Sequence, residues 1–98
     1  MRRVIISGNI WNKISEIKDY LIYELQFSET AAEIRINRME NFVATLSMPA
    51  DYGLCRFKRW QIYGYRCAVF EKTWVFAYEV FDDGVIVRDM AHTAELYD

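Results

Sequence analysis

Proline, glycine and cysteine are scarce in this 98-residue chain, which has one proline, four glycines and two cysteines. Disordered and fibrous proteins are rich in proline and glycine, so the low content of both argues against those classes. Hydrophobic residues make up 53% of the chain and aromatic residues 16%, which is enough for a globular core. We therefore expect a single domain spanning residues 1–98.

Metal ligands and long apolar runs are also scarce. Cys55 and Cys67 are separated by twelve positions without CxxC spacing, and His92 is the only histidine that could join them. The apolar run at residues 4–6 is too short for a signal peptide or a membrane span. We expect a cytoplasmic protein with both thiols reduced, no metal, no cofactor and no membrane association.

Acidic residues are missing from one long stretch, residues 52–70, although the whole chain has a net charge of -2. Guanidinium and ammonium groups neutralise phosphates, and aromatic faces accept stacked bases, so this stretch predicts a surface that binds nucleic acid or another target. Its basic residues are Arg56, Lys58, Arg59 and Arg66, and the aromatic residues among them are Phe57, Trp60, Tyr63 and Tyr65.

The first half of the chain predicts a strand followed by two amphipathic helices. Residues 4–6 read as the strand, after which Asn9 can cap the first helix. Thr30 and Glu33 have the spacing of a capping box for the second helix. The apolar stripes expected on the two helices are Ile10, Ile14, Ile17, Leu21 and Leu25, and then Ala32, Ile36, Met39, Val43 and Leu46.

The second half predicts antiparallel strands. A loop at residues 47–53 contains the proline, and strands are expected over about residues 56–61, 65–70, 74–81 and 85–88 by their alternation and turns. Trp74, Phe76 and Tyr78 form an aromatic stripe expected to pack beneath the helices. The expected fold is α+β with two layers: an N-terminal strand, a helix hairpin, and three or four antiparallel strands in one sheet, with the other face left open.

This order of elements resembles the RelE/ParE superfamily of bacterial toxins from type II toxin–antitoxin modules, often called plasmid stabilisation proteins. The resemblance covers about residues 3–97 and includes a histidine, His92, followed five positions later by a tyrosine, Tyr97. The other matching segments are the loop at 48–53, Tyr65-Arg66, the aromatic strand at 74–78, the turn at 82–84 and the ending at 85–92. The resemblance implies a first strand beside the last and basic residues on the face without helices.

Members of that superfamily either cleave mRNA in the ribosomal A site or poison DNA gyrase without nuclease chemistry. Metal-independent RNA cleavage needs a base, a cation and an acid around one phosphate. If residues 74–78 are the matching strand, Val75 occupies the arginine position of the nuclease branch. If residues 65–69 match instead, Arg66 occupies it, but too many strands follow. The first alignment is preferred, and Arg66 then lies on the neighbouring strand.

The resemblance therefore implies a toxin, with ribosome-dependent mRNA cleavage as the main hypothesis, a gyrase poison as the alternative, and a non-toxic interaction domain as the third. Arg66, His92 and Tyr97 are the candidate catalytic residues. The candidate contacts to nucleic acid or another target are Arg56, Lys58, Arg59 and Lys72. A purely structural or solubilising role stays open for each of them. Either toxin hypothesis implies a cognate antitoxin as partner, besides the ribosome with its mRNA or DNA gyrase.

Overall fold

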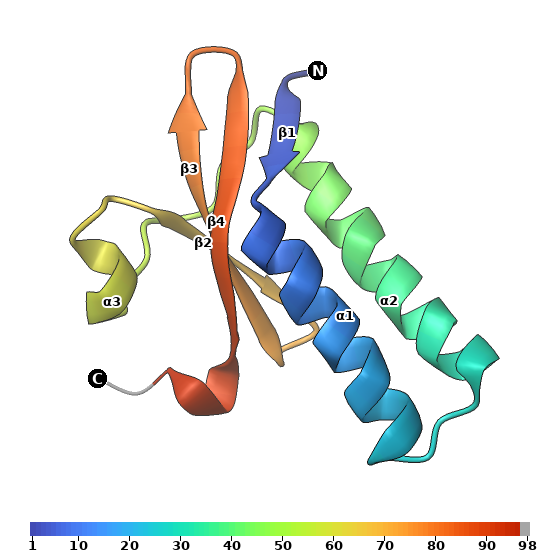
Figure 1. The fold of residues 1–98 in the computed structure, drawn as a ribbon. Coiled ribbons are helices and arrows are strands. Elements are labelled where there is room, and N and C mark those ends of the chain that lie inside the picture. The colour runs from blue at the N-terminus through green and yellow to red at the C-terminus, as the bar shows by residue number, and fades with distance from the viewer. Residues whose placement is uncertain (97–98) are drawn as a thin grey trace.

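The computed structural model describes residues 1–96 and has the expected α+β layout, with a helix hairpin and one four-stranded sheet (Figure 1). The Tyr97 prediction lies outside the described residues. The elements, in order, are β1 (Arg3–Ile6), α1 (Gly8–Tyr23), α2 (Glu29–Ala44), the 3-10 turn η1 (Thr45–Ser47), α3 (Lys58–Gln61), β2 (Arg66–Phe70), β3 (Trp74–Phe81), β4 (Gly84–His92) and the 3-10 turn η2 (Thr93–Glu95).

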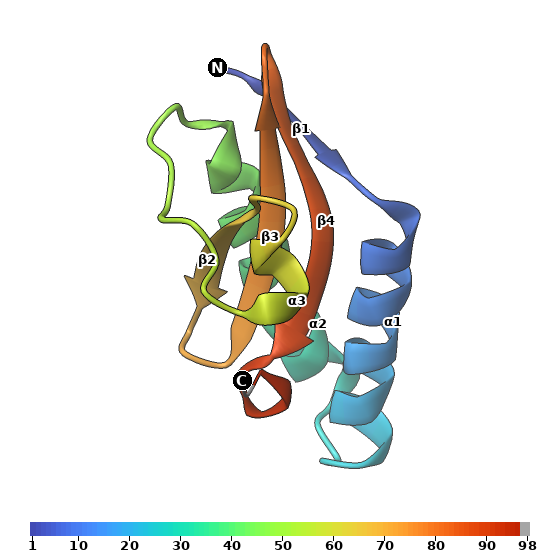
Figure 2. The same cartoon turned by 90° about the vertical axis from the view of Figure 1, so that its left-hand side faces the viewer.

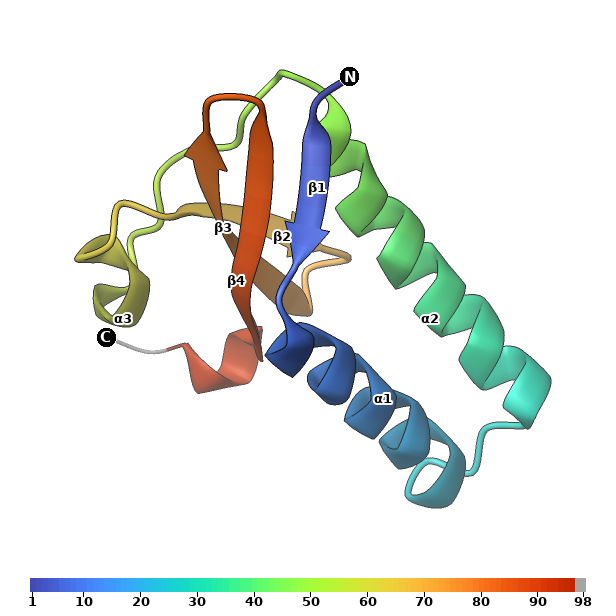
Figure 3. The same ribbon diagram turned by 45° about the horizontal axis from the view of Figure 1, so that its top comes forward.

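The strand order in the sheet is β1-β4-β3-β2, which confirms that the first strand lies beside the last (Figure 3). β1 pairs in parallel with β4, with Val4 opposite Val85, and the other pairs are antiparallel. Gly84 makes this junction possible, because a Cβ atom there would lie only 2.4 Å from the carbonyl oxygen of Arg3. β1 can therefore approach the start of β4 closely only because that position carries no side chain.

The two long helices pack on one face of the sheet and form the larger core. Nearly all of the predicted stripes are confirmed: Ile10, Ile14 and Leu21 are buried, and every residue of the second stripe is buried. Leu25 was wrongly included, because it follows the end of α1 and is 50% exposed. Phe76 and Tyr78 lie in this core with Trp74 packed against it, as predicted.

Both predicted helix caps are wrong by two residues. Ser7 is the N-cap of α1 without a side-chain cap bond, and the side-chain Nδ2 of Asn9 instead donates to the carbonyl of Arg88 at 3.4 Å. Ser28 caps α2, since its Oγ accepts a hydrogen bond from the Ala31 amide at 3.1 Å. Several neighbouring polar residues can serve as a cap, and the direction of chain entry selects one of them.

The second face of the sheet is covered in part, over the first half of β3 and the second half of β4, which corrects the prediction of an open face (Figure 2). The strand expected over residues 56–61 is absent, and the short helix α3 lies there instead. Cys55 and Cys67 form a disulfide bond, so the prediction of reduced thiols is also wrong. Trp60 is only 2% exposed and forms a second, smaller core with residues of β3 and β4. We call residues 53–65 the cover segment.

Candidate functional site

A polar pocket of about 470 Å³ lies where the cover segment meets β4 and the start of α1. The cover segment contains α3, and the Trp60 ring of this helix is buried against β3 and β4. This contact holds the cover segment beside the pocket. Ser7 and Asn9 line the pocket from the α1 side, Arg59, Trp60, Tyr63 and Tyr65 from the cover segment, and Arg88 and Asp89 from β4.

Two arginines and two tyrosines give this pocket its binding chemistry. The rings of Tyr63 and Tyr65 stack with centroids 5.1 Å apart. The Arg59 guanidinium lies 6.0 Å from the Trp60 ring and donates to the Glu95 carbonyl at 3.2 Å. Arg88 is 41% exposed and pairs with Glu79 at 2.8 Å. Such a combination of guanidinium groups and aromatic rings suits a phosphate, a carboxylate or a stacked base.

Asp89 fixes the inner wall of the pocket through three hydrogen bonds. Its carboxylate accepts from Lys13 Nζ at 2.7 Å, from Trp60 Nε1 at 3.0 Å and from the Met90 amide at 2.8 Å. Partial burial opposes ionisation of Asp89, but these donors outweigh it and lower the pKa of the carboxyl group. Asp89 is therefore a charged structural link between α1, α3 and β4.

Only one of the residues predicted for target binding lines this pocket, namely Arg59. Lys58 begins α3 and Arg56 precedes it, and both side chains are exposed. Lys72 lies in the β2–β3 turn with a φ of 61°, away from the cover segment in the chain. The acid-free stretch thus contributes to the pocket through its aromatic residues as much as through its cations.

Arg66 belongs to a separate network that holds the loop before the cover segment. Its guanidinium donates to the carbonyl of Tyr52 at 2.7 Å, while the Tyr52 amide donates to the Tyr78 hydroxyl at 2.9 Å. Arg2 pairs with Asp51 at 2.5 Å, and this hydrogen bond is the main cause of the lowered pKa of Asp51. Burial raises the pKa of the Tyr78 hydroxyl in the same network. Arg66 therefore has a clear structural role.

His92 lies at the opposite end of the sheet from Arg66. Arg66 is opposite Tyr78, and His92 is opposite Trp74, so the two lie about 13 Å apart along the strands and about 10 Å across them. The His92 ring meets the Trp74 ring edge-on at 5.0 Å, and its Nδ1 accepts from the Ala94 amide at 3.0 Å. The structure does not bring these two candidate catalytic residues together.

Val75, which stands at the family's arginine position in the preferred alignment, is buried in the second core. It is 1% exposed and packs in a cluster with Trp60, Ala77 and Leu96. A target cannot reach this position of β3 while the cover segment is in place. At this part of the sheet, the expectation that the face without helices is left open is therefore wrong.

Arg88 and Asn9 are site residues that the sequence interpretation did not include. A register shift in the β3–β4 pair places Ala77 opposite Asp89 and Tyr78 opposite Val87, which leaves Arg88 as the bulged residue. Bulges often redirect a side chain next to a functional site. The only sequence signal was the polar pair Arg88-Asp89 after an apolar strand, which also fits a strand end.

The chain matches none of the protein-family models, and no curated protein is significantly similar to it. Within residues 1–96, no three histidine, cysteine, aspartate or glutamate side chains are grouped so that they could hold a metal ion. No helix in the same range is long and apolar enough to cross a membrane.

Proposed function

We propose that this chain is the toxin of a type II toxin–antitoxin module and that it acts by binding its target at the polar pocket. The observation that supports the proposal is the strand order β1-β4-β3-β2 with the α1–α2 hairpin on one face, which is the arrangement implied by the RelE/ParE resemblance. Fold alone does not determine function, so the proposal also depends on the binding chemistry of the polar pocket.

Binding without cleavage is favoured by the positions of the candidate catalytic residues. General acid–base cleavage needs its groups around one phosphate, whereas Arg66 and His92 lie at opposite ends of the sheet. Val75 and the cover segment above it leave no cation at the position that the nuclease branch uses. The target is then a protein such as DNA gyrase.

Ribosome-dependent cleavage of mRNA is the second candidate, and the arginine pair in the pocket favours it. Arg59 and Arg88 could neutralise the charge that develops on a phosphorane, and the stacked rings of Tyr63 and Tyr65 could hold a base. Under this hypothesis Arg88 takes the role that was expected of Arg66. Under either hypothesis a cognate antitoxin covers the pocket and becomes ordered as it binds.

Controlled expression in bacteria tests both candidates. Expression of the chain should arrest growth, and co-expression of the small protein encoded beside it should restore growth. Arg59→Ala combined with Arg88→Ala should abolish the arrest, because each charge-assisted contact to a target contributes about 1.5 to 3 kcal/mol. Arg35→Ala is the matched control, since Arg35 lies on α2 over the Phe27 ring and outside the pocket.

The state of RNA and DNA in arrested cells then separates the candidates. Intact transcripts together with inhibited supercoiling by purified gyrase would support the binding toxin. Transcripts cut within translated codons would support the nuclease instead. Normal growth at high expression of the folded protein would reject both and leave an interaction domain without toxicity.

A further inference from the structure

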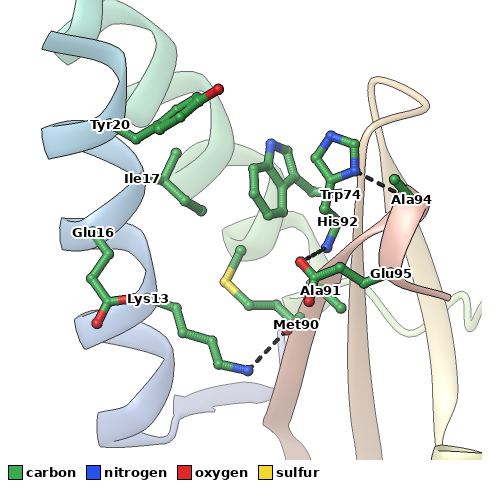
Figure 4. A pocket seen from close by; sticks show the side chains of 10 residues that line it. All are labelled: Lys13, Glu16, Ile17, Tyr20, Trp74, Met90, Ala91, His92, Ala94 and Glu95. Atoms are coloured by element: carbon green, nitrogen blue, oxygen red, sulfur yellow. Dashed lines mark hydrogen bonds between the residues drawn. The ribbon is translucent and has the colours of Figure 1, made fainter. Parts of the chain in front are cut away.

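A second cavity, a groove of about 530 Å³, lies between α1 and the place where β3 begins and β4 ends (Figure 4). Its residues come from α1, β3, β4 and η2, and none of them lines the polar pocket. A smaller cavity of about 150 Å³ shares Ile17, Tyr20, Trp74 and His92 with it and extends toward α2. The volume falls within the range of roughly 300 to 1,000 Å³ that is typical of sites for small molecules.

The groove is lined mainly by apolar and aromatic side chains. Ile17 and Tyr20 approach from α1, and Trp74 and Met90 from the sheet (Figure 4). Tyr20 is 54% exposed although its ring borders an apolar cavity. Aromatic faces and a polarisable thioether together form a surface that attracts cations as well as apolar groups.

The charged groups at the groove are mainly acidic. Glu16 lines it from α1, and Glu95 lines it from η2, where its carboxylate also accepts from the His92 amide at 3.3 Å. Lys13 is the only lysine or arginine among the lining residues. Its ammonium group is already bound to Asp89 at 2.7 Å and to the Met90 carbonyl at 3.1 Å. The remaining negative charge of the lining residues therefore belongs to the carboxylates of Glu16 and Glu95.

We propose that this groove binds a small organic cation, namely an ammonium group carried on an apolar body. The carboxylates of Glu16 on α1 and Glu95 on η2 attract the ammonium group to the groove, and the rings of Tyr20 and Trp74 offer apolar faces to its alkyl substituents. An anion is disfavoured by the two carboxylates, and a neutral apolar ligand gains no electrostatic attraction from them. This site does not depend on the proposed toxin function, because it shares no residue with the polar pocket.

Choline and its neutral isostere 3,3-dimethylbutan-1-ol provide a direct test, because they differ in charge and hardly in shape. Each is titrated into ¹⁵N-labelled protein while the three indole N–H signals are followed by NMR. Choline should shift the Trp74 signal saturably in the millimolar range and leave those of Trp11 and Trp60 nearly unchanged, since neither lines the groove. The alcohol should bind at least about tenfold more weakly.

Matched variants distinguish a built site from general attraction. Glu16→Gln combined with Glu95→Gln should weaken choline binding about tenfold, and glutamine keeps an oxygen that can accept from the His92 amide. Tyr20→Ala should also weaken choline binding, and this variant should keep its fold because Tyr20 is 54% exposed and lies outside the buried core. Glu24→Gln, outside the groove at the end of α1, should bind as the parent does. Equal binding of choline and the alcohol, no saturable Trp74 shift, or unchanged affinity in the Gln variants would overturn the proposal.

Discussion

At the scale of single residues, Asp89 makes the contacts on which the polar pocket depends most. It joins Lys13 on α1 to the indole of Trp60 on α3, and these two helices pack on opposite faces of the sheet. The strong network around it explains why a charged side chain can be partly buried here without instability. A sequence shows the aspartate but not the three donors around it.

The ionisation of Asp89 predicts how stability depends on pH. Because the pKa of Asp89 is lowered in the folded state, the ionised carboxylate stabilises the fold above about pH 4, and this contribution is lost as the pH falls through the folded-state pKa. Asp89→Asn should lower the free energy of unfolding near neutral pH by about 1 to 3 kcal/mol. Urea denaturation at several pH values measures this.

The difference in free energy of unfolding between the parent and Asp89→Asn should shrink in acid, because Asp89 of the parent is then protonated in both the folded and the unfolded state. Asp82→Asn in the β3–β4 turn is the control substitution, because it changes a carboxylate outside this network. A stability difference that stays constant down to strongly acidic pH would show that the charge of Asp89 is not the cause of the loss of stability in Asp89→Asn.

At the scale of elements, the β2–β3 turn holds two residues that strain its backbone. Glu71 and Lys72 have φ values of 49° and 61°, while the Thr73 amide donates to the Phe70 carbonyl at 3.0 Å across the turn. Two positive φ values in succession define a tight hairpin turn that glycine and asparagine favour. Glu71 and Lys72 therefore occupy positions at which glycine would adopt the same backbone conformation with less steric strain.

Lys72→Gly should raise the free energy of unfolding by about 1 kcal/mol, because glycine adopts a positive φ without the steric cost of a Cβ atom. Lys72→Ala is the matched control, since it removes the same charge and keeps the Cβ atom. Thermal and urea denaturation of the two variants measure the difference. A similar gain in both variants would assign the effect to the charge of Lys72 rather than to the backbone.

The cover segment shows why element prediction failed at one place. The turn signal at Tyr63-Gly64 favoured a separate strand over residues 56–61, but Lys58–Gln61 form one helical turn. Four residues are too few for periodicity to separate a strand from a helix. The buried indole of Trp60 decides between them, because the helical turn directs it onto the small residues Ala77 and Ala91.

At the scale of the whole molecule, the fold has two cores separated by the sheet. The larger core lies under the helix hairpin, and the smaller one lies under the cover segment and η2. The disulfide between Cys55 and Cys67 ties the start of the cover segment to β2. The second core is small, so we expect this covalent link to contribute much of its stability.

Reduction of the disulfide should therefore destabilise the protein. A closed loop of this length predicts a loss of about 3 kcal/mol in the free energy of unfolding. Denaturation with and without a thiol reductant measures the loss, and the Trp60 indole signal reports on the cover segment. The Cys55→Ala, Cys67→Ala double variant is the control and should not respond to the reductant. Equal stability of the parent under both conditions would contradict the prediction.

The sequence by itself determined the helix hairpin, the β3–β4 hairpin and the side of the sheet that holds the larger core. These features follow from local periods of burial in Ile10, Ile14 and Leu21 on α1 and from alternation in β3. Residues on successive turns of a helix, or at alternate positions of a strand, face the same surroundings, so burial repeats with a fixed spacing. This repeat can be read from a short stretch of sequence, which is why these elements could be predicted.

Only the tertiary structure decided what covers the second face and which residues meet there. Arg59 and Arg88 are far apart in the sequence and line one pocket because a bulge and a helical turn direct them to the same place. Arg66 and His92 belong to one sheet and yet lie at opposite ends of it. Such contacts depend on register and on long-range packing, which no local pattern of residues specifies.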